Sequence, residues 1–295
     1  MKIIPFAVSS RFNEQQYEQG AQWLLQNRCE ILSNPILRIG LETYLNGSDE
    51  ERLRELQRAC SEERADAIWA VRGGYGMTRL LPMLKDCEPV APIVGFSDTT
   101  ALMMHFWALH GLKSLHAPLI TQLSEESAES SQALLLALNG QARDVAYPSL
   151  SLRKTYLKDR IRGTLLAANL SMLVELLGTR SMPSLCGTIL VLEDVGEKPY
   201  RLDRMLTHLW AAGALKGIQA IVLGYLTDCG DEPFKVFEER CQSFEIPLLT
   251  GLPVGHEQPN WPVPIGVEAE IQLQSHRGTL KVLEEVFPSR LLFRC

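Results

Sequence analysis

The sequence predicts an α/β protein of two domains, the first of which is built on a parallel sheet. A length of 295 residues suits two domains. In the first half, short apolar runs alternate with segments of helical period, and the composition changes at about 141–160. We therefore expect an N-terminal α/β domain over 1–142, a linker over 143–160 and a C-terminal domain over 161–295.

The predicted strands of the first half are short runs rich in β-branched and aromatic residues, such as KIIPFAV and DAIWAV. They lie at 2–8, 36–41, 66–71 and 91–96. The helices between them carry apolar residues at helical spacing, and one begins at the cap-like sequence GSDEE. They lie at 13–27, 49–63, 76–85 and 98–110. Because helices separate the strands, the strands are expected to run parallel.

The second half begins with a turn-rich and then basic, polar stretch, after which apolar runs return. Helices are expected at 168–178, 201–214 and 233–242, and strands at 187–193 and 218–225. Near the C-terminus, VEAEIQL and GTLKVLE alternate apolar and polar residues, which predicts a β-hairpin.

The composition argues against several classes of function. The net charge is -6 and no basic cluster occurs, so a nucleic-acid partner is not expected. No stretch approaches the ~20 apolar residues of a membrane span, and the N-terminus lacks a signal-peptide core, so we expect no membrane partner and a cytoplasmic location. Seven cysteines and six histidines are scattered without disulfide or metal-ligand spacing. We therefore expect no metal and no cofactor.

The strongest local signal is APIVGFSDTTALMMHF, in which a buried strand is followed by Gly95, one further residue and Ser97, and a helix begins at once. A side chain at such a corner is lifted clear of the sheet, beside a helix N-terminus that favours negative charge. This suits a nucleophile. The alternative is a plain helix N-cap, since serine is a preferred cap and the hydrolase elbow G-x-S-x-G has a second glycine where Thr99 stands here.

A nucleophilic serine needs a base and a group that orients the base. Glu193 ends the apolar strand GTILVLE, at an edge where α/β sites gather, although a solvated loop acid is the alternative. His256 lies in LPVGHEQPNWPVPIG, whose prolines would stiffen the loop around the imidazole, although a surface histidine is the alternative. Packing or surface positions are expected for the remaining histidines, His105, His110, His116, His208 and His276.

The glycine-rich loop in AVRGGYGMTRLLPML follows a buried strand and by itself suits a phosphate cradle, an oxyanion hole or a tight turn. A nucleotide-binding phosphotransferase is disfavoured because the chain has no G-x-x-x-x-G-K-[ST]. In addition, Tyr75 stands where kinases with a Gly-Gly-Asp-Gly loop carry an acid. A non-catalytic binding protein on the same scaffold is a further alternative.

Five motifs in register give the chain a specific resemblance: VRGGYG, GFSDTTAL, GTLLAANLSML, VLEDVGEKPYRLDRML and GHEQPNWPVPIG. In this order and at these spacings, from about residue 3 to 285, the chain resembles the LD-carboxypeptidases, the murein tetrapeptide carboxypeptidases of bacterial cell-wall recycling. The resemblance implies that the C-terminal domain is a smaller α/β domain and that the active site lies between the two domains.

The resemblance also implies a serine-type carboxypeptidase with a Ser-His-Glu triad. Ser97 would be the nucleophile, His256 the general acid and base, and Glu193 the carboxylate that orients the imidazole. The implied oxyanion donors are the N–H of Asp98 and that of a glycine in the glycine-rich loop. Of the glycines in this loop, Gly74 is preferred and Gly73 is the second choice.

The substrate that the resemblance implies is a murein tetrapeptide, which loses its terminal D-alanine through an acyl-enzyme. The sister group, the microcin C self-immunity peptidases, cleaves an amide in a peptidyl or aminoacyl nucleotide, and Trp261 in the histidine loop leaves this alternative open. A homodimer is a further family-based expectation. The family commonly has two glycines where this chain has Ala167 and Ala168, and their methyl groups would narrow the site if the backbone must approach closely there.

A carboxypeptidase must also recognise a free carboxylate, and a bidentate arginine is the usual means. The sequence does not single out one arginine for this role. The arginines that lie in or beside the motifs are Arg72, Arg79, Arg201 and Arg204.

Overall fold

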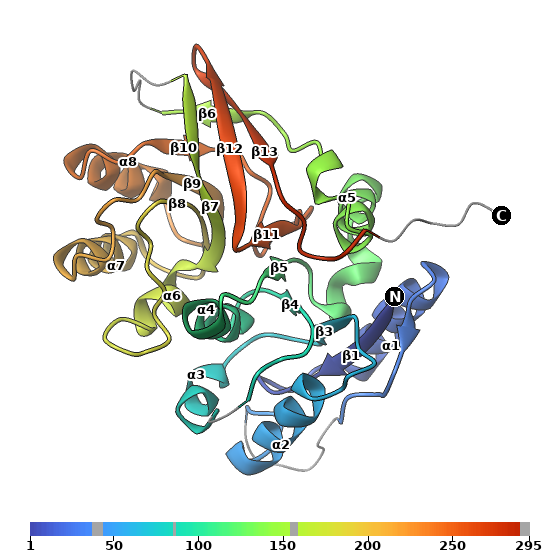
Figure 1. The fold of residues 1–295 in the computed structure, drawn as a ribbon. Helices are drawn as coiled ribbons and strands as arrows, with labels where there is room; N and C mark the ends of the chain where they lie inside the picture. The colour runs from blue at the N-terminus through green and yellow to red at the C-terminus, as the bar shows by residue number, and fades with distance from the viewer. Residues whose placement is uncertain (37–43, 85–86, 154–158, 290–295) are drawn as a thin grey trace.

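The computed structural model describes residues 1–36, 44–84, 87–153 and 159–289 (Figure 1). Its first sheet has six strands, in the order β11 (Val263–Ile265), β5 (Ser114–His116), β4 (Ile93–Gly95), β3 (Ala67–Ala70), β1 (Lys2–Phe6) and β2 (Glu30–Ile31). From β5 to β2 all neighbouring strands are parallel, whereas β11 runs antiparallel to β5. The predicted α/β class with a parallel N-terminal sheet is thus confirmed.

The first four helices of the first half correspond to the predicted ones, and a fifth helix follows them. They are α1 (Glu14–Gln26), α2 (Asp49–Cys60), α3 (Met77–Leu80), α4 (Thr99–His110) and α5 (Ala128–Leu138), with 3-10 turns at Leu81–Met83, Ile120–Glu125 and Ala142–Asp144. The predicted helix at 76–85 is shorter than expected, because the chain tightens into a 3-10 turn at Pro82, which has no N–H to donate. The predicted strand at 36–41 lies outside the described residues except for Ile36.

The second sheet closes into a barrel. Its strands are β10 (Leu248–Thr250), β6 (Leu150–Leu152), β13 (Arg277–Val282), β12 (Val267–Gln274), β7 (Arg160–Asn169), β8 (Thr188–Val195) and β9 (Ala220–Thr227), in that order. The helices of this half are α6 (Leu170–Glu175), α7 (Pro199–Ala211) and α8 (Pro233–Ser243). The predicted hairpin is confirmed as β12 and β13, whose buried and accessible residues alternate as the sequence alternates.

Strand β7 corrects the sequence interpretation, which predicted a helix at 168–178 after a polar stretch. The chain remains a strand as far as Asn169, and the helix α6 ends at Glu175. The first residues of β7 alternate between accessible and buried positions, with Arg160 and Arg162 outside. This alternation is typical of a strand with one solvated face.

Two short strands cross the domain limits that were predicted from the sequence. Strand β6 lies inside the predicted linker and belongs to the barrel, and β11 comes from the predicted C-terminal domain and joins the N-terminal sheet. The domain limits therefore stay a prediction. Each of these two strands has only three residues, which gives too few positions for a periodic signal.

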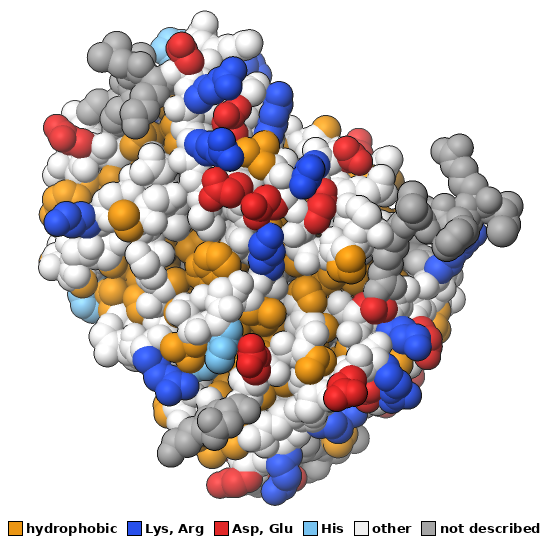
Figure 2. Space-filling view, viewed as in Figure 1, with side chains coloured by type: hydrophobic (Ala, Val, Ile, Leu, Met, Phe, Trp, Pro, Cys, Tyr) orange, Lys and Arg blue, Asp and Glu red, His pale blue; other side chains and the backbone are white. Residues whose placement is uncertain are grey.

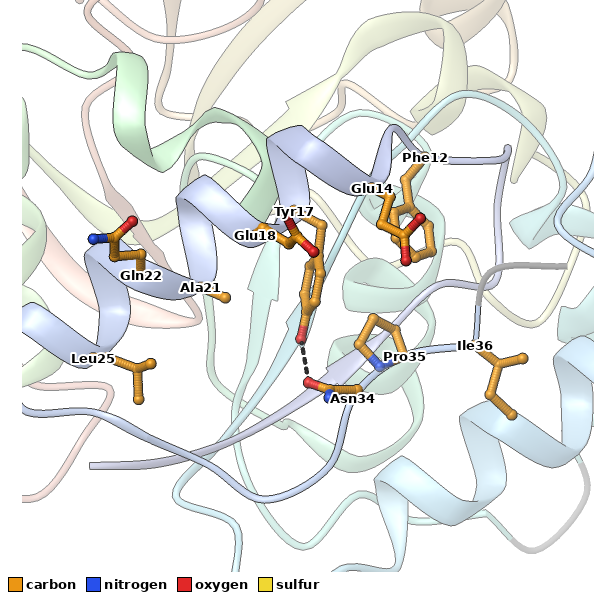
Figure 3. Close-up of a pocket in the computed structure, with 10 residues that line it drawn as sticks. All are labelled: Phe12, Glu14, Tyr17, Glu18, Ala21, Gln22, Leu25, Asn34, Pro35 and Ile36. Carbon is orange, nitrogen blue, oxygen red and sulfur yellow. Dashed lines mark hydrogen bonds between the residues drawn. The ribbon is translucent and has the colours of Figure 1, made fainter. Parts of the chain in front are cut away.

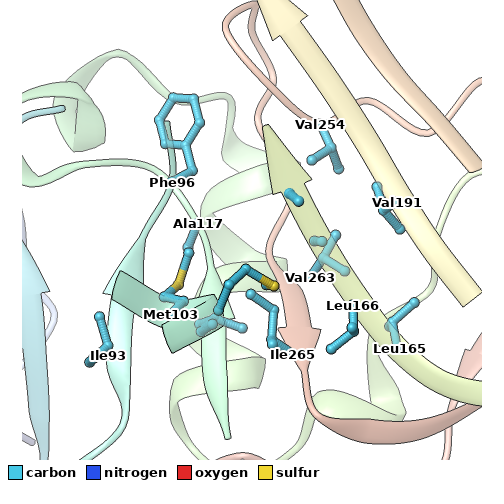
Figure 4. Packing of buried hydrophobic residues seen from close by; sticks show 14 of the residues in the cluster. Ile93, Phe96, Met103, Ala117, Leu165, Leu166, Val191, Val254, Val263 and Ile265 are labelled. Carbon is cyan, nitrogen blue, oxygen red and sulfur yellow. The ribbon is translucent and has the colours of Figure 1, made fainter. Parts of the chain in front are cut away.

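A shared apolar core lies where the first sheet meets the barrel (Figure 4). Phe96 and Met103 of the first half belong to this core together with Ile265 of β11 and Leu166 of β7, and all four are fully buried. Burial of this size contributes roughly 1.5–3 kcal/mol for each large apolar side chain. The packing holds the corner after β4 at a fixed position relative to the barrel.

On the face of the molecule that Figure 2 shows, acidic and basic side chains lie side by side rather than in a patch of one sign. No helix among the described residues combines the length and the apolar character that crossing a bilayer requires.

Candidate active site

Ser97 lies at the corner between β4 and α4, in the backbone conformation of a strained turn. Its φ is +59°, a left-handed value that is rare for a residue other than glycine and that clusters at functional sites. The N-cap of α4 is Asp98, whose side chain makes no capping hydrogen bond. The alternative that Ser97 is a plain N-cap is therefore wrong, and its Oγ lies 3.2 Å from Nε2 of His256.

Glu193 and His256 form a close pair behind Ser97. Oε2 of Glu193 lies 2.7 Å from Nδ1 of His256. Glu193 belongs to β8 and is 1% exposed, so it is not a solvated loop acid. Burial lowers the pKa of His256, but the hydrogen bond and the negative charge of Glu193, with a smaller effect of Asp194, outweigh burial, and the net pKa lies above its ordinary value.

The loop that carries His256 is held at several points. Gly255 has a φ of +129°, and a Cβ added there would lie 2.9 Å from Oε2 of Glu193, so only glycine fits beside the carboxylate. The N–H of Gly255 donates to Oδ1 of Asn260 at 3.0 Å. Asn260 is buried, and its own N–H donates to Glu126 while its carbonyl accepts from Oγ of Ser130. The imidazole is thus positioned by contacts to both halves of the chain.

The glycine-rich loop lies against the nucleophile. A Cβ added at Gly73 would lie 3.0 Å from both Cβ and Oγ of Ser97. Gly74 has a φ of +107°, and a Cβ there would lie 2.3 Å from Oγ of Ser10. Oγ of Ser10 also accepts the N–H of Tyr75 at 3.2 Å, so that N–H is occupied.

Asp98 ties this loop to the nucleophile corner. Its buried carboxylate accepts hydrogen bonds from Oγ of Ser9 at 2.5 Å and from the N–H of Met77 at 2.9 Å. Burial raises the pKa of Asp98, and these hydrogen bonds oppose the rise. Among the described residues, the N–H groups of Asp98, Gly73 and Gly74 have no hydrogen-bond acceptor, which leaves them free to meet a ligand.

The two alanines at the positions where the resemblance implies glycines are strand residues. Ala167 and Ala168 are fully buried in β7 and pair with Val191 and Leu192 of β8. Helix α6 begins directly afterwards, where the side chain of Asn169 accepts the N–H of Met172. Neither methyl group prevents the strand or the helix cap from forming.

The four arginines selected from the motifs have other partners. Arg79 binds Asp49 through Nε and Nη2, and Arg201 lies 3.3 Å from Glu197. Arg204 lies over the Tyr200 ring at 5.6 Å, and Nη1 of Arg72 donates to the carbonyl of Arg11.

The other aromatic and histidine positions are mostly structural. Trp261 packs on the buried ring of Tyr147, with centroids 6.0 Å apart. Nδ1 of His105 lies 2.8 Å from Oγ of Ser181. His116 is fully buried, and its ring lies 5.4 Å from that of Phe96, whose other neighbour at 4.8 Å is His256. The sequence interpretation of His116 as a packing residue missed its place in the wall behind the triad.

Three further features of the structure were compared with the predicted site: a buried carboxyl group beside Glu193, a separate cavity, and the clustering of potential metal ligands. Asp194 is buried beside Glu193 and accepts hydrogen bonds from Asn169 and Ser171, and burial raises its pKa to about 6. A separate cavity of about 580 Å³ lies between α1 and the segment that ends at Ile36 (Figure 3). None of the predicted site residues lines it. No group of three or more potential metal ligands occurs among the described residues.

Comparison with known proteins gives consistent matches. Residues 3–117 match the family model for the LD-carboxypeptidase N-terminal domain, and residues 162–271 match the model for the LD-carboxypeptidase C-terminal domain. The chain is 36% identical to the murein tetrapeptide carboxypeptidase of Pseudomonas aeruginosa, over 78% of this chain and 80% of that protein. It is 24% identical to the microcin C7 self-immunity protein of Escherichia coli, over 88% and 86% of the two chains. The crystal structure of muramoyltetrapeptide carboxypeptidase from Oxalobacter formigenes superposes with a TM-score of 0.81 at 27% identity, covering 97% of this chain and 99% of that one.

Proposed function

The chain belongs to the LD-carboxypeptidase family, and from that premise we propose that it is a serine peptidase that releases terminal D-alanine from murein tetrapeptides. The observation that carries the proposal is the line of contacts from Ser97 through His256 to Glu193, at 3.2 Å and 2.7 Å. These are the contacts that a nucleophile, its base and an orienting carboxylate require.

In the first half of the reaction, Nε2 of His256 accepts the proton of Ser97 as Oγ attacks the carbonyl carbon of the scissile bond. Glu193 fixes the tautomer by accepting the N–H at Nδ1, and it stabilises the imidazolium that forms. The imidazolium then protonates the nitrogen of the leaving D-alanine, which leaves an ester on Ser97. Water attacks this acyl-enzyme in the second half, with His256 again acting as the base.

The tetrahedral intermediate carries a negative oxygen, which needs donors that are already in place. The N–H of Asp98 and an N–H of the glycine-rich loop are the proposed donors, and the loss of one such donor typically costs about 2.7–4 kcal/mol of transition-state stabilisation. Gly73 and Gly74 are the candidates in the loop. The proposal is supported by the closeness of Gly73 to Oγ of Ser97 and by the absence of other acceptors for these N–H groups among the described residues.

A nucleotide amide substrate is the alternative that the self-immunity proteins raise. An aromatic platform for a base would favour it, but Trp261 is engaged with Tyr147. We therefore propose the muropeptide as the substrate, and a direct competition tests the choice. The tetrapeptide and an aminoacyl sulfamoyl adenylate are offered together, and mass spectrometry identifies which one is cleaved.

Ser97→Ala tests the chemistry itself. The variant should release no D-alanine above the uncatalysed rate, while its thermal unfolding stays close to that of the wild type. Ser184→Ala, at an exposed serine, is the matched control and should keep wild-type turnover. Undiminished release by Ser97→Ala would exclude the proposed nucleophile.

A further inference from the structure

Arg11 lies in the loop that follows β1. Its Nε and Nη2 are buried and have no hydrogen-bond partner among the described residues. No ion pair of Arg11 occurs among the described residues. Burying guanidinium nitrogens without an acceptor is costly, and the five N–H groups of an arginine can act only as donors. The unpaired nitrogens therefore call for an acceptor from outside the chain.

The two unpaired nitrogens are the pair that binds a carboxylate side-on. Elsewhere in this structure, Nε and Nη2 of Arg64 bind the two carboxylate oxygens of Glu62 at 2.7 Å and 3.0 Å. Parallel N–H···O bonds of this kind give an arginine its selectivity for carboxylates. Arg11 has the same two donors free.

The loop of Arg11 adjoins the proposed oxyanion site. The N–H of Ser10 donates to the carbonyl of Gly73 at 3.2 Å. The carbonyl of Arg11 accepts from Nη1 of Arg72, the residue before Gly73. Since Gly73 is the glycine that lies against Oγ of Ser97, Arg11 follows directly on a residue that contacts the loop bordering the nucleophile.

Two other arginines near this loop, Arg52 and Arg79, do not offer the same donors. Arg52 is fully buried, but it binds Asp49 at 2.6 Å and the carbonyl of Gly76 at 3.1 Å. Arg79 is bound to the same Asp49 through both Nε and Nη2. Both guanidinium groups are already neutralised within the chain.

We propose that Arg11 binds the free α-carboxylate of the substrate's terminal residue through Nε and Nη2, and is thus the residue that makes the enzyme a carboxypeptidase. The inference rests on the proposed function. In the substrate, this carboxylate belongs to the residue directly after the scissile bond, and consecutive Cα atoms are about 3.8 Å apart. A bound terminal carboxylate must therefore lie within one residue of Ser97, on the leaving-group side.

The test compares a tetrapeptide that has a free terminal carboxylate with the same peptide ending in D-alaninamide. The wild type should cleave the acid with a kcat/KM at least tenfold above that for the amide. Arg11→Gln should raise KM for the acid about ten- to hundredfold, the range for hydrogen bonds to a charged group, and leave the amide unchanged. Arg11→Lys keeps the positive charge but loses the two parallel N–H donors, so its KM for the acid should lie between those of the wild type and Arg11→Gln. Arg79→Gln removes the same charge from a paired arginine and should keep the wild-type preference for the acid.

The outcomes separate the role of Arg11 from the proposed function. If the wild type releases D-alanine and Arg11→Gln keeps the full preference for the acid, the role of Arg11 is refuted and the peptidase proposal stands. If the wild type cleaves neither peptide, and Ser97→Ala binds neither by calorimetry, the proposed function fails and the role of Arg11 fails with it. If Ser97→Ala binds the acid but not the amide, and the double variant Ser97→Ala, Arg11→Gln no longer binds the acid, the role of Arg11 is supported independently of turnover.

Discussion

Replacement of Gly73 by alanine tests whether the glycine-rich loop must lie against the nucleophile. The added methyl group would lie 3.0 Å from Cβ and Oγ of Ser97 and 3.6 Å from the N of Asp98. Carbon atoms pack best at about 3.5–4.0 Å, so one side must move. If the loop recedes, an oxyanion donor is withdrawn, and if Ser97 turns, Oγ leaves Nε2 of His256.

Either movement removes an interaction that acts in the transition state. We expect kcat to fall about 10²–10³-fold, the loss that follows removal of one oxyanion donor. The backbone of Gly73 has no positive φ, so alanine introduces no backbone strain there, and the free energy of unfolding should stay within about 1 kcal/mol of the wild-type value. The assay measures D-alanine release from the tetrapeptide beside urea unfolding of the same samples.

Gly74→Ala is the matched control, because alanine there meets both a positive φ of +107° and Oγ of Ser10 at 2.3 Å. It should lower the free energy of unfolding by about 1–2 kcal/mol or more, whereas Gly73→Ala should not. A Gly73→Ala protein that folds normally and retains wild-type kcat would refute the proposed role of this loop.

Three further predictions concern groups around the triad. Because Glu193 keeps the pKa of His256 above 6.5, kcat/KM should rise with pH through a midpoint above that value, as the imidazole loses its proton and can act as the base. Glu193→Gln should move this midpoint to lower pH. An unchanged midpoint would contradict the pairing of Glu193 with His256. Asn260→Ala removes the acceptor of the Gly255 N–H and should lower kcat with little change in KM, and wild-type kcat would mean that the loop needs no such anchor. Ser9→Ala removes a hydrogen-bond donor to the buried carboxyl group of Asp98 and should lower the free energy of unfolding by about 1–3 kcal/mol at pH 7. That deficit should shrink as the pH falls and the carboxyl group is protonated, and a pH-independent deficit would count against this explanation.

The three triad residues could be found in the sequence because each leaves a local signal. Ser97 and Glu193 stand at the ends of apolar strands, and prolines surround His256. The same signals could not decide between catalytic and ordinary roles. For Ser97, the backbone conformation decides against a helix cap, and for Glu193, burial within β8 decides against a loop acid. Both properties depend on packing that no short window of sequence contains.

The residues that the sequence missed act over long separations. Asn260 is bonded to Ser130 and Glu126, which lie 130 and 134 positions earlier in the chain. Arg11 stands in a polar loop and has no motif of its own, so only its unpaired, buried nitrogens draw attention to it. Of the arginines in or beside the motifs, Arg79 and Arg201 form ion pairs with carboxylates. The position of an arginine near a motif therefore does not indicate whether its guanidinium is left unpaired and able to bind a substrate carboxylate.

The path of the histidine loop explains how a triad drawn from two sheets keeps its geometry. The loop leaves the barrel at β10 and enters the first sheet as β11, so each of its ends is anchored in a different sheet. Ser97 follows a strand of the first sheet, whereas Glu193 lies on a strand of the barrel. Any displacement of one sheet from the other would lengthen a contact of His256, either to Ser97 or to Glu193. Because β11 pairs with β5 beside the strand that leads to Ser97, such a displacement would also break backbone hydrogen bonds. The same strand that the sequence could not predict therefore resists the motion that would most damage the proposed site.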